Sequence, residues 1–303
     1  MSAPKVSLEQ WRILHSIITE GGFAQAAKKL NKSQSAVSYA VSKIQEQLGL
    51  DVLTINGRKA ELTEAGELLL RRSRILLDEA ENLEAAAKSL NDGWEATISI
   101  ASEVLFPQHL LMAALDRLSE EAPYTRVEII ESVMSGTEDL IVQKKVDLAI
   151  CGMQPAGYVG VPLMDMEFAL VSGPDHPLAK QNDLVTFQQL SQYRQIVIRD
   201  SGEKRSGSGG WQKAEQRWTF SHSGTAREAL KRGYGFSWAP TCSLIEEINR
   251  GEIVRLKIEG TTNKRVTLNL VYPNIDTAGP ATKRLETLLL DVVDQHQRKF
   301  MNC

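Results

Sequence analysis

Short polar side chains that could hydrogen-bond to the edges of DNA bases gather on one face of a predicted helix. The helix would begin after Ser33, a candidate N-cap, and end before Gly49. The candidate DNA contacts, which include the cap, are Ser33, Gln34, Ser35, Ser38, Tyr39, Ser42 and Lys43. Gln can pair two hydrogen bonds with adenine, and Ser and Tyr can bond base edges or phosphates. A solvated face is the alternative, but such faces are usually rich in Glu, and no acid lies between Gln34 and Gln45. The pattern therefore favours a recognition helix.

Two shorter helices and a hairpin would position this helix. Apolar residues recur at helical spacing from Leu8 to Ile18, and a second short helix is predicted from Phe23 to Leu30. Two short strands, 51–55 and 59–63, flank Asn56-Gly57, a strong signal for a tight hairpin. Arg58 and Lys59 lie at this hairpin, where a wing would contact the DNA backbone or minor groove, although they could equally serve only to keep a turn soluble. A winged helix-turn-helix is predicted over residues 1–63.

The charge of the chain is distributed unevenly. Residues 1–63 contain eight Lys or Arg and five Asp or Glu, a net charge of +3, whereas the whole chain carries −3. The remaining residues therefore carry −6. A basic segment attached to an acidic body is compatible with double-stranded DNA as the partner of that segment alone.

A long helix is predicted over residues 64–92. Glu64 and Glu67 would lie in its first turn, after the candidate cap Thr63, where carboxylates interact favourably with the helix dipole. Large and small residues alternate at heptad spacing, namely Leu69, Ser73, Leu76, Ala80, Leu83, Ala87 and Leu90. This pattern favours pairing of two copies of the helix and hence a homodimer, although a helix packed on its own domain would show a similar stripe. Asn91-Asp92-Gly93 would end the helix at a domain boundary.

The N-terminal pattern resembles that of the LysR-type transcriptional regulators. The resemblance rests on three segments, which are FAQAAKKL at 23–30, SQSAVSYAVSKIQEQLG at 33–49 and LTEAG at 62–66. It implies a DNA-binding regulator that dimerises through its linker helix, commonly assembles as a homotetramer and carries a two-lobed effector domain like that of periplasmic binding proteins. The chain departs from the family pattern at Ser35, Tyr39 and Thr54, where Pro, Arg and Phe are common. Because of these departures, above all Tyr39, no operator sequence is inferred from the family.

Residues 93–303 alternate strands and helices in the manner of an α/β domain. Strands are predicted at 97–101, 126–131 and 147–151, with helices at 107–121 and 136–144, which implies a mostly parallel sheet with helices on both faces. A further strand at 163–172 leads to a second set at 195–199, 218–221 and 236–239. A strand at 266–272 and a helix at 280–297 complete the chain. The chain would leave a first lobe (93–168 and 269–303) for a second lobe (169–268), and the two crossings would make a hinge and enclose a cleft.

The ends of the predicted strands supply candidate contacts for a small organic effector in that cleft. These candidates are Ser102, Glu103, Val133, Gly152, Asp200, Ser201, His222 and Ser223. A helix start favours a carboxylate and Val133 and Gly152 favour apolar bulk, which suggests an aromatic or other moderately apolar acid. Glu103 counts against an anion and would suit a cation or amine, unless it points away. The stretch 201–210 is predicted to be a loop at the mouth of the cleft.

Signatures of catalysis are missing from the sequence. It contains no Gly-x-Ser-x-Gly elbow, no His-Glu-x-x-His and no paired Cys motif, and nothing in the spacing of His222, Ser201 and Asp200 supports a catalytic set. The sequence therefore predicts no enzyme, no cofactor and no metal site. The three Cys residues are scattered, which argues against a disulfide framework and fits a reducing cytoplasm. No stretch of 18 apolar residues is present, so no membrane partner is expected.

A ligand-responsive transcription factor is the leading hypothesis. A DNA-associated oligomerising protein without an effector would share the same N-terminal segment, and a solute-binding or metabolic protein with an incidental helix-turn-helix is a third possibility. Sequence-dependent gel retardation and a ligand-induced shift in melting temperature would separate the three.

Overall fold

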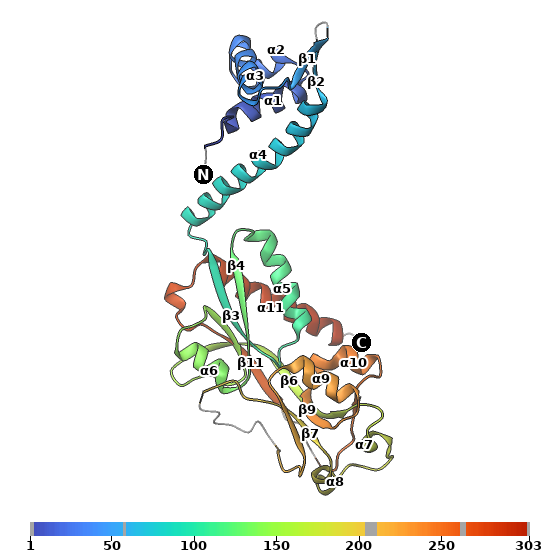
Figure 1. Ribbon diagram of the computed structural model, residues 1–303. Helices are drawn as coiled ribbons and strands as arrows, with labels where there is room; N and C mark the ends of the chain where they lie inside the picture. The colour runs from blue at the N-terminus through green and yellow to red at the C-terminus, as the bar shows by residue number, and fades with distance from the viewer. Residues whose placement is uncertain (1–2, 57–58, 204–210, 261–264, 302–303) are drawn as a thin grey trace. The chain divides into compact units, whose positions relative to one another are not determined.

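The computed structural model describes residues 3–56, 59–203, 211–260 and 265–301 of the 303-residue chain (Figure 1). The chain divides into two compact units, Met1–Asn91 and Asp92–Cys303. The first unit contains the head and the long helix together, and the second contains the alternating strands and helices.

Three helices and a hairpin form the head of the first unit. They are α1 (Leu8–Glu20), α2 (Phe23–Lys29) and α3 (Gln34–Leu48), followed by the antiparallel strands β1 (Leu53–Asn56) and β2 (Lys59–Leu62). Both predicted ends of α3 are confirmed. The Ser33 hydroxyl accepts a hydrogen bond from the Ala36 amide at 3.1 Å, and Gly49 ends the helix with a φ of 70°, a conformation that glycine adopts readily.

The core of the head differs slightly from the predicted stripes. Leu14 and Ile17 of α1 and Ile44 of α3 are buried, as are the paired alanines of α2. Leu8 is 44% exposed and Leu48 is 36% exposed, because the first turn of α1 and the last turn of α3 extend past this core. The core is therefore built from the central turns of the helices.

The long helix α4 (Glu64–Asn91) starts in close contact with the head. The Thr63 hydroxyl accepts a hydrogen bond from the Gly66 amide at 2.9 Å and donates one to the Asp51 carbonyl at 2.8 Å. A side chain at Gly66 would bring its first carbon to 2.0 Å from the Val52 carbonyl oxygen. Only glycine therefore allows the helix to approach the start of the hairpin this closely.

The predicted dimer seam is wrong at its first two positions, Leu69 and Ser73. Leu69 packs on the core of the head, and Ser73, which is 4% exposed, hydrogen-bonds His15 Nε2 at 3.0 Å. Burial and the nearby Arg74 lower the pKa of His15, so the ring is neutral at neutral pH. In the first half of α4, the side of the helix that carries Leu69 and Ser73 therefore packs on the head of its own chain.

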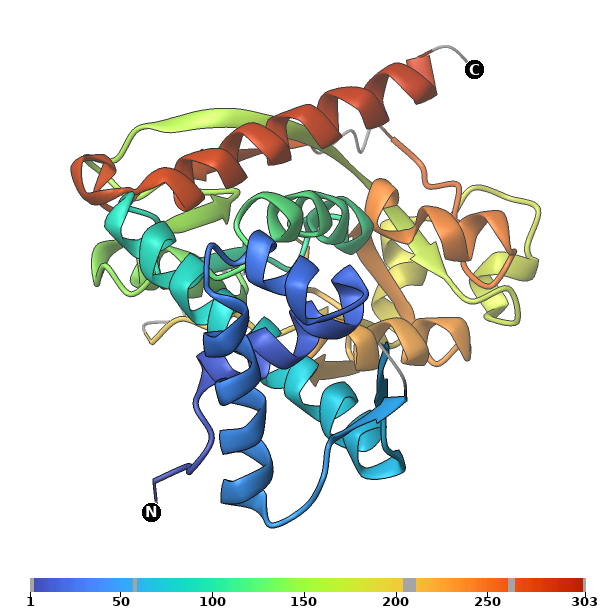
Figure 2. The ribbon, with the colours of Figure 1, turned by 90° about the horizontal axis from the view of Figure 1, so that it is seen from above.

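The first lobe of the second unit contains a sheet with the strand order β4-β3-β5-β11-β6. Its elements are β3 (Thr97–Glu103), α5 (Gln108–Glu121), β4 (Arg126–Ser132), α6 (Ser135–Val142), β5 (Leu148–Cys151), β11 (Arg265–Val271), the short η2 (Ile275–Thr277) and α11 (Pro280–Met301). Helices α5 and α11 lie side by side over one face, as Figure 2 shows, and bury Ile100, Leu111 and Leu289 against it. Helix α6 covers the other face with Ile141.

The second lobe contains a smaller sheet in the order β6-β9-β7-β8, and β10 pairs the other edge of β6. Its strands are β7 (Gln195–Ile198), β8 (Arg217–Phe220), β9 (Phe236–Pro240) and β10 (Val254–Arg255). Its helices are α7 (Pro177–Lys180), α8 (Phe187–Gln192), α9 (Ser223–Lys231), η1 (Thr241–Leu244) and α10 (Ile245–Asn249). One cluster, which includes Ile196 and Leu230, packs α9 on the sheet, and another around Phe236 fills the opposite side.

A single strand, β6 (Gly160–Ser172), runs through both lobes. Its residues up to Glu167 pair with β11 in the first lobe, and from Phe168 onward they pair with β9 in the second. The return crossing precedes Arg265, which pairs with Glu167, so residues 265–268 belong to the first lobe and not, as predicted, to the second. The pairs β5–β11, β11–β6 and β6–β9 are antiparallel, so the sheet is mixed where a mostly parallel one was predicted.

Candidate functional site

The polar face of α3 lies open to solvent. Its predicted members Ser33, Gln34, Ser35, Ser38, Tyr39 and Ser42 are exposed, with Tyr39 the largest at 65%. Lys43 is half-buried and its ammonium group pairs with Glu46 at 2.7 Å. Exposed ion pairs of this kind contribute little to stability, so the lysine is free to exchange Glu46 for a phosphate.

A glutamine that the sequence did not suggest couples α3 to the hairpin. Gln45 Oε1 accepts hydrogen bonds from the amides of Val52 and Leu53, both at 3.1 Å. The hairpin is therefore held at a fixed distance from the exposed face of α3. Of the two predicted wing contacts, Arg58 lies outside the described residues, and Lys59 begins β2 with a side chain that is likewise not described.

Helix α4 exposes an apolar face along most of its length. Its large exposed side chains are Leu68, Ile75, Leu76, Leu83 and Leu90. Leu76, Leu83 and Leu90 follow one another at intervals of seven and belong to the predicted seam, whereas Leu68 and Ile75 were not predicted. The exposed face is rotated away from Leu69 and Ser73, which are occupied within the head.

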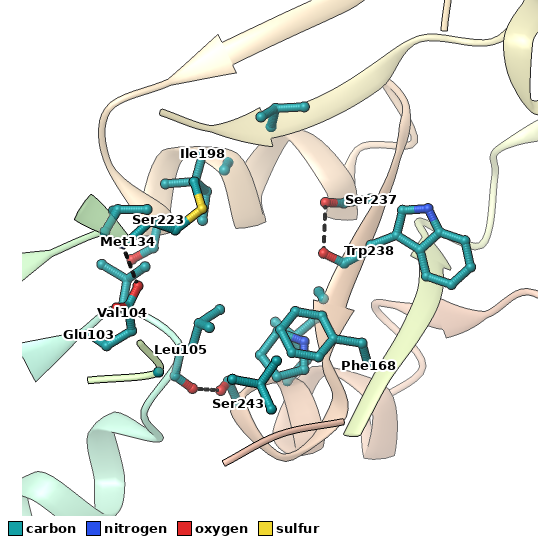
Figure 3. Close-up of a pocket in the computed structure, with 18 of the residues that line it drawn as sticks. Glu103, Val104, Leu105, Met134, Phe168, Ile198, Ser223, Ser237, Trp238 and Ser243 are labelled. Atoms are coloured by element: carbon teal, nitrogen blue, oxygen red, sulfur yellow. Dashed lines mark hydrogen bonds between the residues drawn. The ribbon is translucent and has the colours of Figure 1, made fainter. Parts of the chain in front are cut away.

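A cavity of about 640 Å³ lies between the two lobes of the second unit. Four predicted contacts line it, namely Glu103, Val133, Gly152 and Ser223. Residues from β6, β9 and the helices of the second lobe, including Phe168, Ser237, Arg227 and Ser243, also line it but were not predicted. Figure 3 shows Leu105 and Phe168 at the cavity, with the Trp238 ring turned away.

Ser102 does not line the cavity, contrary to the prediction. It is 5% exposed within β3, where it lies between Glu131 of β4 and Ile150 of β5. Successive residues of a strand point to opposite faces, so Ser102 and Glu103 cannot both face the cavity. The strand directs Glu103 into the cavity.

Asp200 and Ser201 also fail as predicted cavity contacts, because they join the lobes directly. The Ser135 hydroxyl donates to Asp200 Oδ2 at 2.7 Å, and the Val133 amide donates to Ser201 Oγ at 2.9 Å. A side-chain carbon added at Gly136 would lie 1.9 Å from Ser201 Oγ. We call this arrangement, residues 133–136 against 200–202, the lobe contact. The segment 204–210 of the predicted mouth loop lies outside the described residues.

His222 is not among the residues that line the cavity either. Its backbone forms the N-cap of α9, and the exposed ring hydrogen-bonds the Ser221 hydroxyl through Nδ1 at 2.9 Å. The next residue, Ser223, lines the cavity.

Glu103 lies at the start of α6, beside the predicted contact Val133. It is 3% exposed, and its two oxygens accept hydrogen bonds from the Met134 amide at 2.9 Å and the Thr137 hydroxyl at 3.1 Å. Burial raises the pKa of Glu103 to about 7, with the negative charges of Asp200 and Glu138 acting in the same direction and the two hydrogen bonds opposing them. The protein's own carboxylate therefore lies where a carboxylate ligand would bind the start of α6, and the acidic character suggested for the effector stays a prediction.

The opposite wall of the cavity belongs to the second lobe. Arg227 lies there and pairs with Glu247 at 3.2 Å, while its other nitrogen donates to the Ser243 carbonyl at 3.4 Å. The Ser243 hydroxyl donates to the Leu105 carbonyl, which ties this wall to the first lobe (Figure 3). The described residues contain no group of three or more side chains suited to a metal ion.

Two family descriptions match the chain and together span most of it. "LysR substrate binding domain" matches residues 91–294, and "Bacterial regulatory helix-turn-helix protein, lysR family" matches residues 8–67. The chain belongs to the LysR-type transcriptional regulators. It combines the helix-turn-helix DNA-binding domain and the effector-binding domain of that family, as the sequence predicted.

Relatives of this LysR-type regulator have similar names. The uncharacterized HTH-type transcriptional regulator YeeY of Escherichia coli K12 is 30% identical over 203 residues, 66% of each chain. The probable HTH-type transcriptional regulator YhaJ of the same strain is 28% identical over 262 residues, 85% of this chain and 88% of YhaJ.

Solved structures show the same fold. CrgA, a LysR-type regulator from Neisseria meningitidis, matches with a TM-score of 0.53 at 22% identity, covering 97% of this chain and 99% of its own. The Vibrio cholerae virulence activator AphB matches with a TM-score of 0.53 at 16% identity, covering 94% and 99%. None of the helices in the described part of the LysR-type chain has the length and apolar character that a membrane crossing needs.

Proposed function

We propose that this LysR-type regulator binds operator DNA through the exposed face of α3 and responds to a small organic effector in the cavity between its lobes. The observation that supports DNA binding is the exposure of Gln34, Ser38 and Tyr39 on one face of α3. The opposite face of this helix packs in the core of the head. Side chains of this size allow a helix to enter a major groove, where base edges are accessible. A regulator of this kind acts where its DNA is, in the cytoplasm.

Replacing Gln34 or Ser38 by Ala is expected to weaken binding to an operator selected from random DNA. Each lost base contact should cost about 1–3 kcal/mol, whereas binding to unrelated DNA changes little. Both side chains are exposed, so the melting temperature should stay within a degree or two of wild type. Gel retardation at fixed salt measures the first quantity and circular dichroism the second.

Gln47→Ala is the matched control for this experiment. Gln47 lies on the same helix, but its side chain accepts a hydrogen bond from Gln10 within the head. Its replacement should leave operator affinity unchanged. If Gln34→Ala and Ser38→Ala behave like the control, α3 does not contact the bases.

The cavity supports the second half of the proposal. Its volume lies in the range of small-molecule sites, and its walls are largely apolar with a few polar groups, among them Glu103, Ser237 and Arg227. Both lobes contribute to the walls, so a bound molecule would alter the free energy of lobe closure. An architectural DNA-binding protein would have no use for such a cavity.

Leu105→Trp is expected to fill the cavity and abolish binding of whichever compound raises the melting temperature of the wild-type protein in a metabolite screen. Leu105 points into the cavity in Figure 3, and an indole there occupies space that a ligand needs. Leu184→Trp makes the same substitution at a side chain that is 55% exposed and is not part of the cavity wall. A compound that binds both variants equally well by calorimetry does not bind in this cavity.

We also propose that the protein pairs through the exposed apolar face of α4, assembles further into a tetramer, and has no catalytic role. Asp200, Ser201 and His222, whose side-chain types could suit catalysis, are each engaged in other hydrogen bonds. Asp200 and Ser201 bond the start of α6, and His222 bonds Ser221.

A further inference from the structure

We propose that the cavity selects an organic cation, a primary amine joined to an apolar body, whose ammonium group faces Glu103. This inference rests on the proposed function, because it assumes that the effector occupies the cavity. It replaces the acidic effector that the sequence suggested with a ligand of the opposite charge.

Most hydrogen-bond donors at the start of α6 are already used within the protein. The Val133 amide donates to Ser201, and the Met134 amide and Thr137 hydroxyl donate to Glu103. The Ser135 hydroxyl donates to Asp200. A carboxylate entering from the cavity would meet the Glu103 carboxylate and find most of the hydrogen bonds that stabilise an anion already formed.

Glu103 keeps acceptor capacity that faces the cavity. Each of its oxygens accepts one hydrogen bond in the described structure, whereas a carboxylate oxygen can accept about two. The charged groups acting on it are Asp200, on the loop after β7, and Glu138 of α6, and both are acidic. The Cys151 thiol of β5 also lies close, and burial raises its pKa to about 12, so it is neutral. An ammonium group would supply both the missing donors and the missing positive charge.

A second buried acceptor lies in the wall contributed by the second lobe. Gln195 is 4% exposed, and its amide nitrogen donates to the Trp211 carbonyl at 2.8 Å. Its Oε1 atom is buried and has no hydrogen-bond partner within the described structure. A buried acceptor without a partner is unfavourable, so a small rearrangement of the wall that let a ligand N–H group reach this atom would be favourable.

The cations of the wall do not offset this preference. Arg227 is already paired with Glu247 and the Ser243 carbonyl. Arg265 is exposed, where water and salt screen its charge. Between the two polar ends, Leu105, Phe168 and Ile198 provide apolar surface for the body of the ligand (Figure 3).

The test compares three compounds that share an indole ring and differ in the charge of the side chain. Tryptamine, tryptophol and indole-3-acetate are titrated calorimetrically into the full-length protein at pH 8, where Glu103 is ionised. Tryptamine carries the ammonium group and a ring N–H, and it is expected to bind at least tenfold more tightly than the other two. Glu103→Gln should remove this preference, whereas Glu131→Gln, at an exposed acid of β4 outside the cavity wall, should retain it.

Proton release gives a second readout that needs no variant. Because the pKa of Glu103 is about 7, the carboxyl is mostly protonated at pH 6 and must lose its proton to pair with the amine. Tryptamine affinity should therefore fall about tenfold for each pH unit below 7. Binding at pH 6 should release close to one proton, measured as the dependence of the heat on the ionisation enthalpy of the buffer.

The outcomes separate this inference from the proposed function. If tryptophol or indole-3-acetate binds as tightly as tryptamine and Leu105→Trp abolishes that binding, the cavity is an effector site and the amine inference is wrong. An amine preference that survives Glu103→Gln, or that appears without proton release at pH 6, also overturns it. If none of the three compounds binds, or if Leu105→Trp leaves their affinity unchanged, both proposals fail.

Discussion

Leu83→Glu is expected to leave the protein monomeric at micromolar concentration, where the wild-type protein forms the proposed dimer. Leu83 is 72% exposed, and it lies between Leu76 and Leu90 on the apolar face of α4. If two copies pair there, the new carboxylate becomes buried without a partner, a change that typically costs several kcal/mol and so raises the dissociation constant by more than two orders of magnitude. Sedimentation equilibrium measures this constant directly.

The same substitution at a position off the apolar face is the control. Ala85 is two residues further along α4 and half-buried, roughly opposite the apolar face of the helix. Ala85→Glu should leave the protein dimeric. The monomeric Leu83→Glu protein should also lose affinity for an operator with two half-sites while retaining weak binding to one. A Leu83→Glu protein that stays dimeric would place the interface elsewhere.

Gly136→Val is expected to break the lobe contact. Even the first carbon of the side chain would lie 1.9 Å from Ser201 Oγ, so the loop at 200–202 must move away from α6. Overpacking at such a site typically costs about 1–3 kcal/mol. The loss should appear as a lower melting temperature of the effector domain and as faster hydrogen exchange of the Val133 amide, which donates to Ser201 in the wild-type protein.

Two further glycines show whether the effect comes from the lobe contact. Gly202→Ala should act in the same way, because its first side-chain carbon would lie 2.1 Å from Ser135 Oγ, and its cost should not add fully to that of Gly136→Val. Gly224→Ala, at a helical position with nothing within 4 Å, should be neutral or slightly stabilising. Unchanged exchange at Val133 in both lobe-contact variants would mean that the lobes do not depend on this contact.

Features that depend on only a few consecutive residues were predictable from the sequence. The Ser33 cap, the Gly49 stop and the hairpin around Asn56-Gly57 all follow from local backbone chemistry, and all three appear in the structure. The order of the longer strands in the second unit, and the helices α5, α6 and α11, follow from hydrophobic periodicity in the same way, whereas the short helices α7, α8 and α10 and the strand β10 were not predicted. The helices and the hairpin of the head could therefore be predicted without knowledge of tertiary contacts.

Features that depend on distant partners were not predictable. A heptad pattern records which face of α4 is apolar, but Leu69 and Ser73 show that part of this face binds α1 of the same chain. Ser102 and Glu103 were both predicted as contacts because they lie at the end of β3. Side chains alternate between the two faces of a strand, so only Glu103 faces the cavity. The role of Asp200 became visible only with its partner Ser135, which is 65 residues away in the chain.

The hydrogen bond between His15 and Ser73 helps the head and the long helix α4 to move as one body. The packing of Leu69 and Leu77 on the head core, together with this hydrogen bond, restricts the motion of α1 relative to the first half of α4. The 28 residues of α4 span about 42 Å, so a tilt of this helix by about 10° displaces its far end by about 7 Å. That displacement is about two base-pair steps of DNA, enough to move a recognition helix from one set of bases to another.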